Sequence, residues 1–195
     1  MNRTRISRLL SLTALAVIGV LFSSSLIWAQ TAPPADTLKV NYFSNANLGY
    51  PSATVYVSDP GTNAPANICA MIYVVDPAQE LRECCGCMIT PDGLLTLSVD
   101  WDLTHNSNTP GALNNGTIKI VSSTGAPTCN PSKPVPTATV RAWGTHIQTN
   151  GVLTETEALD APLSTNEVTK LGALCGSIMR NSSGYGVCTC GTNQN

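Results

Sequence analysis

The sequence has little charge and few aromatic rings. Only 11% of its 195 residues are charged, and 5% are aromatic. Ten basic residues stand against twelve acidic ones, so no basic excess is present to attract a polyanion. We therefore expect no nucleic-acid partner and no binding to anionic membrane surfaces.

Signatures of catalysis and of cofactor binding are also missing. No serine stands in a G-x-S-x-G pattern, and no C-x-x-C-H spacing for covalent haem attachment occurs. The only two histidines, His105 and His146, lie in no recognisable nucleophile–base motif. The sequence thus predicts no catalytic residue, no cofactor, and a protein that is not an enzyme.

The N-terminus has the features of an export signal. Three arginines precede an apolar run, Leu9–Phe22, which is too short for a comfortable membrane span. We predict that residues 1–29 are a signal peptide cleaved after Ala29. The alternative is an uncleaved anchor, because residues 26–28 extend the apolar run. Cleavage places the protein in a secreted, extracellular or periplasmic location, with membrane contact only through the signal peptide before cleavage.

The remaining chain is predicted to form one domain. Residues 30–36 are rich in proline and indicate a linker, which leaves 37–195 as a single folded unit. Because residues 1–29 contain three arginines, the rest carries seven basic against twelve acidic residues, a net charge of −5.

Strand patterns dominate this unit. The segment Ile68–Val75 is almost entirely apolar, which predicts a central strand buried on both faces. From Leu95 to Leu103 apolar and polar residues alternate strictly, which predicts a strand with one buried face and places Trp101 in the core. Several further short strands and frequent turns favour an antiparallel β-sandwich of immunoglobulin-like architecture.

The C-terminal part changes to a helical period. Ser164 and Glu167 have the spacing of a capping box, and an apolar stripe follows at positions 168, 171, 174, 175 and 178. We predict one amphipathic helix over 164–181, packed on the sandwich. Residues 186–190 are expected to form a final strand.

An even number of cysteines in an exported chain predicts a disulfide framework. The eight candidates are Cys69, Cys84, Cys85, Cys87, Cys129, Cys175, Cys188 and Cys190. Two antiparallel C-x-C strands would place 85 and 87 opposite 188 and 190, and the helix cysteine would join Cys84 or Cys69. The alternative is a four-thiolate metal site built from the two C-x-C segments, although structural zinc usually prefers C-x-x-C spacing.

These cysteines belong to a set of distinctive motifs. The set consists of Glu83-Cys84-Cys85-Gly86-Cys87 with Thr90-Pro91, then Glu155-Thr156-Glu157, Leu163-Ser164 and a tail from Gly184 to Cys190. With this E-C-C-x-C motif and C-terminal C-x-C, most of the chain beyond residue 29 resembles a family of uncharacterised exported bacterial proteins. The resemblance implies export and oxidised cysteines, and it implies no activity.

Two aspartates are the remaining candidates for a metal site. Asp100 and Asp102 lie on one face of the predicted strand, and their oxygens are suitable ligands for calcium. A solvated outer face is the simpler interpretation, because His105 stands where a calcium loop needs glycine. Trp143 shares a face with Arg141 and Thr145, so it is a weaker core candidate than Trp101.

These observations favour an exported, non-catalytic structural or surface protein, such as an adhesive or filament-type subunit. Residues 30–43 join a linker to a strand, so the N-terminal strand could complete the sheet of a neighbouring copy and mediate self-association. The alternative is an extracellular module that binds a metal or a carbohydrate.

Overall fold

The apolar segment Ile68–Val75 forms strand β3, and all but its last residue are buried. Burial on both faces is confirmed, because alternate side chains of β3 belong to two separate buried clusters. Strand β3 lies in the larger of two sheets, between β4 and β6. This sheet has the order β10-β1-β6-β3-β4, with β7 paired to β6. Its strands are β1 (Leu38–Ser44), β3, β4 (Leu81–Ile89), β6 (Asn115–Thr124), β7 (Val135–Pro136) and β10 (Leu159–Asp160).

The structure is a computed structural model that describes residues 37–44, 53–62, 66–105, 113–147, 152–181 and 186–191. The signal peptide and linker predicted over 1–36 lie outside the described residues. Within these ranges, no helix is long and apolar enough to cross a membrane.

The second sheet has four antiparallel strands in the order β5-β2-β8-β9. They are β2 (Thr54–Ser58), β5 (Leu94–Ser98), β8 (Arg141–Ile147) and β9 (Leu153–Glu157). Alternate residues of both sheets point toward each other, and Val57, Ile72, Leu97 and Ile120 are fully buried in the resulting core. The prediction of a mainly antiparallel β protein with two layers of sheet is confirmed.

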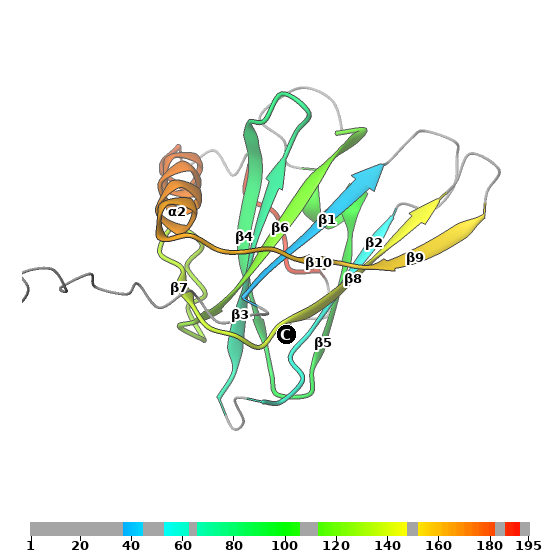
Figure 1. The fold of residues 1–195 in the computed structure, drawn as a ribbon. Helices are drawn as coiled ribbons and strands as arrows, with labels where there is room; N and C mark the ends of the chain where they lie inside the picture. The colour runs from blue at the N-terminus through cyan, green and yellow to red at the C-terminus, as the bar shows by residue number, and fades with distance from the viewer. Residues whose placement is uncertain are drawn as a thin grey trace, which may run out of the picture. The chain divides into compact units, whose positions relative to one another are not determined.

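A helix covers the other face of the larger sheet, so Figure 1 shows this sheet between α2 on one side and the second sheet on the other. Helix α2 spans Thr165–Arg180, close to the predicted 164–181. The predicted cap is present, since Ser164 Oγ accepts a hydrogen bond from the Glu167 backbone N–H at 3.1 Å. The Glu167 carboxylate also binds Lys119 on β6, which ties the first turn of the helix to the sheet.

The buried stripe of α2 forms a second core with the outer face of β3 and β4. Leu171 and Ile178 are buried there, and each such side chain contributes about 1.5–3 kcal/mol when removed from water. Leu174, predicted on the same stripe, is 40% exposed instead. Its position lies at the border of the apolar face of the helix.

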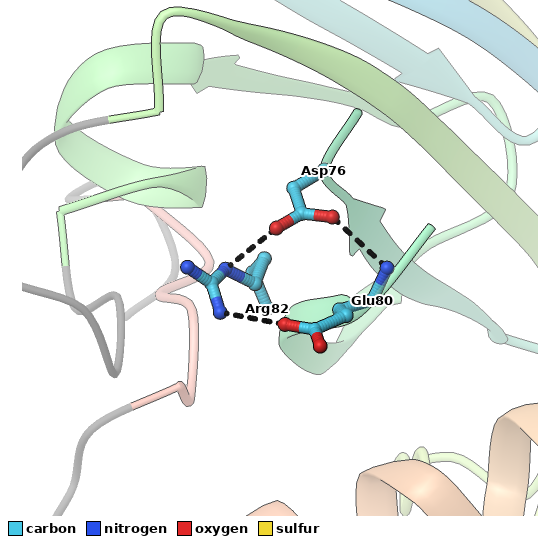
Figure 2. Close-up of polar contacts among 3 residues, drawn as sticks. All are labelled: Asp76, Glu80 and Arg82. Carbon is cyan, nitrogen blue, oxygen red and sulfur yellow. Dashed lines mark hydrogen bonds and ion pairs between the residues drawn. The ribbon is translucent and has the colours of Figure 1, made fainter. Parts of the chain in front are cut away.

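A polar cluster fixes the turn between β3 and β4 (Figure 2). Asp76 Oδ1 accepts from the Glu80 backbone N–H at 2.9 Å, and its Oδ2 lies 3.1 Å from Arg82 Nε. Arg82 also contacts the Glu80 carboxylate at 3.2 Å. Together with Gln79, which takes a positive φ of 67° to close the turn, these contacts set the register of β3 against β4.

The long alternating strand predicted over residues 95–103 is wrong in its second half. Strand β5 ends at Ser98, and Val99–Leu103 form a single π-helical turn, η1. Val99 and Leu103 remain buried, but Trp101 is 66% exposed rather than in the core. The cause is local, because Ser98 Oγ accepts from the Trp101 N–H and so competes with sheet pairing.

Strand β1, the proposed donor for self-association, is paired on both sides within its own domain. Seven residues pair with β6, and two pair with β10. Phe43 and Lys39 are fully buried, and the Lys39 ammonium binds the carboxylate of Asp160 on β10. Exchange of β1 between copies would therefore have to replace an intact set of contacts.

The packing around Gly86 on β4 gives a testable prediction. A Cβ added to Gly86 would lie 1.9 Å from the backbone oxygen of Cys129, in a loop that a disulfide holds in place. We expect Gly86→Ala to lower the free energy of unfolding by about 1–3 kcal/mol or more. Gly176→Ala in α2 is the control, since its nearest contact is an ordinary 3.4 Å from Ser132 Cβ.

The helical control should be neutral, or more stable by up to about 1 kcal/mol, because alanine favours a helix over glycine. Urea unfolding without reductant measures both variants. Equal stability of Gly86→Ala and the unmodified protein would contradict the close packing.

Candidate functional site

All eight cysteines are paired, and none is free. The bonds are Cys69–Cys129, Cys84–Cys175, Cys85–Cys188 and Cys87–Cys190. The disulfide framework is thus confirmed. The alternative of a four-thiolate metal site fails, because all four sulfurs of the two C-x-C segments are used in bonds to each other.

Strand β4 is the centre of this framework, because it supplies three of the bonded cysteines. Successive side chains of a strand point to opposite faces. Cys84 therefore faces α2 and binds Cys175, which is one of the two pairings predicted for the helix cysteine; Cys69, the other predicted partner, binds Cys129. Cys85 and Cys87 face the second sheet and join the core between the two sheets. One strand is thus fastened on both of its faces.

The C-terminal segment runs beside β4 in the direction opposite to the one predicted. Its two disulfides, Cys85–Cys188 and Cys87–Cys190, each join residues 103 apart in sequence. Because the two separations are equal, the C-terminal segment and β4 run in the same direction. The pairing of Cys84 with Val187 is accordingly parallel. Val187 makes only a single bridge, and the predicted final strand over 186–190 does not form.

The same segment also contacts η1, the turn that follows β5 of the second sheet, through Asp102. The Thr189 backbone N–H donates to the Asp102 carbonyl at 2.9 Å, and Thr189 Oγ1 lies 3.0 Å from Asp102 Oδ1. The other carboxylate oxygen accepts from the Ser98 backbone N–H at 2.7 Å. Residues 186–191, which we call the C-terminal strap, therefore connect the edge of β4 to η1 beyond β5.

Asp102 is consequently part of the internal bonding of the fold and not a solvated residue on a strand face. Asp100 lies in the same π-helical turn and is partly exposed. Across the described ranges, no three side chains of His, Cys, Asp or Glu gather into a group that could hold a metal ion. Calcium binding by Asp100 and Asp102 stays a prediction.

The two histidines lie on aromatic rings. His146 stacks on Tyr42 at 6.2 Å between ring centroids, and its Nε2 lies 2.9 Å from Thr156 Oγ1. Partial burial lowers the pKa of His146, which favours the neutral ring. His105 packs at 5.2 Å against the exposed Trp101. In the described part of the chain, neither ring contacts a serine or cysteine that it could activate.

A cleft of about 400 Å³ lies between the end of β4, the start of β5 and residues 127–129. Its lining includes Met88, Leu94, Leu95 and Pro127, and it contains no ionisable side chain. Thr90 and Thr128 also line the cleft, so its wall is mixed polar and apolar.

The outer face of the smaller sheet carries an aromatic pair that the sequence pattern did not bring together. Tyr56 on β2 lies directly opposite Trp143 on β8, and both rings are partly exposed. The alternation of each strand indicates which residues share a face. It does not indicate that β2 and β8, separated by more than 80 residues, are neighbours.

Comparison with protein-family models, with curated proteins and with solved structures finds no match to this chain.

The bond between α2 and β4 gives a testable prediction. Replacing both Cys84 and Cys175 by alanine opens a connection between residues 91 apart in sequence. We expect the free energy of unfolding to fall by about 2–5 kcal/mol, because the unfolded chain gains freedom. The amides of α2 should exchange faster in hydrogen-exchange mass spectrometry, while those of β3 stay protected by the remaining bonds.

The matched control removes Cys69 and Cys129 instead. This variant also loses one bond, but α2 keeps its attachment to β4. Equal acceleration of α2 exchange in both variants would contradict a specific role for the helix disulfide.

Proposed function

We propose that this chain is an exported, non-catalytic structural protein of the cell exterior, released after cleavage of residues 1–29. The single observation that carries the proposal is the arrangement of its four disulfides. They fasten both faces of the larger sheet to α2, to the loop around Cys129 and to the C-terminal strap. Disulfides at this density are typical of oxidising compartments, where they persist.

The polar groups of the described residues support a role without catalysis. Asp102 is used to hold the C-terminal strap, and Lys39 and Lys119 are used in ion pairs within the domain. The cleft beside β4 has no ionisable lining. These three charged side chains thus stabilise the folded domain, as expected for a structural protein.

An immunoglobulin-like arrangement of the two facing sheets belongs to the same proposal. So does membership of the exported bacterial family that the E-C-C-x-C motif resembles. Both are consistent with short antiparallel strands around a shared core. Sandwiches of this kind are common in surface proteins, because their loops and outer faces can vary without disturbing the core.

Self-association, in this proposal, uses exchange of β1 between copies. The seven residue pairs that β1 forms with β6 of its own chain would form again with β6 of the neighbouring copy, so exchange loses few contacts. Exchange would join copies without a new interface and would produce the filament or layer expected of a surface subunit.

The first experiment tests export and location. We expect the protein from source cells to begin at Gln30 by N-terminal sequencing, to contain no free thiol, and to be labelled on the cell exterior by immuno-electron microscopy. Protein retained inside intact cells with reduced cysteines would overturn the proposal, as would turnover of a substrate by the purified protein.

The second experiment tests exchange of β1. Ser44 and Asn115 are opposite each other on β1 and β6. A disulfide formed by Ser44→Cys with Asn115→Cys can therefore hold β1 in the sheet of its own chain. We expect the locked protein to stay monomeric in light scattering while the unmodified protein assembles. The control lock, Thr54→Cys with Ser98→Cys across β2 and β5, should leave assembly intact. Assembly of the β1-locked protein would exclude exchange.

A further inference from the structure

The outer face of the smaller sheet presents one continuous row of side chains across four strands. In this row Tyr56 pairs with Thr96 on β5 and with Trp143 on β8, and Trp143 pairs with Glu157 on β9. Paired residues in antiparallel strands point to the same face. Since Val55, Val57 and Ala142 point into the core, this row points away from it.

The two aromatic side chains at the centre of the row are accessible in part. Tyr56 and Trp143 are each intermediate in exposure, so part of each side chain meets solvent. Among the described residues, neither the Tyr56 hydroxyl nor the Trp143 indole N–H makes a hydrogen bond. Two partly exposed aromatic side chains are thus placed at paired positions of neighbouring strands, each with a polar group that can still form a hydrogen bond.

We propose that this aromatic row, Thr96-Tyr56-Trp143-Glu157, binds a neutral polysaccharide chain. The flat, C–H-rich face of a pyranose ring can stack on an aromatic ring, and its hydroxyls can bond to the ring edges and to Thr96. Neighbouring strands lie about 4.8 Å apart, which is close to the length of one pyranose unit. A row across four strands therefore matches an extended chain better than a single sugar.

The charges around the row indicate that the chain is neutral. Its centre carries no charge, whereas Glu155 and Glu157 are exposed along β9 and Arg141 is the nearest exposed cation on β8. Two carboxylates against one guanidinium give the rim a negative balance. Anionic polysaccharides and nucleic acids would be repelled, and neutral hexose polymers would not be.

This inference goes beyond the proposed structural role and does not depend on it. A surface protein that fails to bind glycans remains a surface protein, so the two proposals fail separately. If both hold, the row would connect an oxidised, exported scaffold to the carbohydrate of a cell wall or a biofilm matrix.

Affinity gel electrophoresis of the mature protein tests the inference. The gels contain hydroxyethylcellulose, xyloglucan, galactomannan or laminarin as neutral probes, and alginate as the anionic probe. We expect at least one neutral polysaccharide to retard the protein and alginate not to. Trp143→Ala and Tyr56→Ala should weaken retardation at least about tenfold, because each removes a stacking surface.

Two further variants separate binding from folding. Trp101→Ala removes a 66% exposed tryptophan outside the row and should leave retardation unchanged. Tyr56→Phe keeps the ring but loses the hydroxyl, and should weaken binding about 3- to 10-fold at an unchanged melting temperature. Lack of retardation by every neutral probe, stronger retardation by alginate, or an equal effect of Trp101→Ala would overturn the inference.

Discussion

Strand β4 must be held on two faces and along one edge, and the rest of the domain depends on that requirement. Its cysteines alternate, so Cys84 reaches α2 while Cys85 and Cys87 reach the C-terminal strap on the opposite face. The C-C-x-C spacing within this motif supplies one cysteine to one face of the strand and two to the other. Helix, strap and sheet are thus organised around five consecutive residues.

This arrangement compensates for a sheet that would otherwise be open. Without α2, the outer face of β3 and β4 would expose Met71, Tyr73 and the surrounding apolar residues to water. Without the strap, the backbone of β4 would offer an unpaired edge, which is a hazard for aggregation. The strap pairs at Cys84 and reaches Asp102 beyond β5, so it shields the edge and joins the two sheets.

Several elements could be predicted from the sequence because one local rule decides each of them. A short apolar run such as β3 favours a strand buried on both faces, and the Ser164 cap with its following stripe favours a helix. The oxidised state of the cysteines is predicted from their even number and the expected export signal. In each case the signal lies in neighbouring residues, and the rest of the fold does not oppose it.

The predictions that were wrong concern segments in which side-chain hydrogen bonds or distant strands decide the structure, and a local sequence pattern does not show these interactions. Alternation continued through Trp101, but side-chain bonds from Ser98 and Asp102 closed a π-helical turn instead. The direction of the C-terminal strap depends on where α2 ends relative to β4. The pairing of Tyr56 with Trp143 depends on which strands become neighbours in the sheet. These are properties of the complete fold, so short-range spacing cannot determine them.

The disulfides overlap along the chain, and this has a consequence for damage to the backbone. A single cut anywhere between Cys69 and Cys190 leaves both fragments joined by at least one disulfide, and a cut between Cys87 and Cys129 leaves them joined by all four. A molecule cut once by a protease within this range would therefore stay in one piece. The disulfides therefore keep the fragments of one molecule joined even when the polypeptide is no longer continuous.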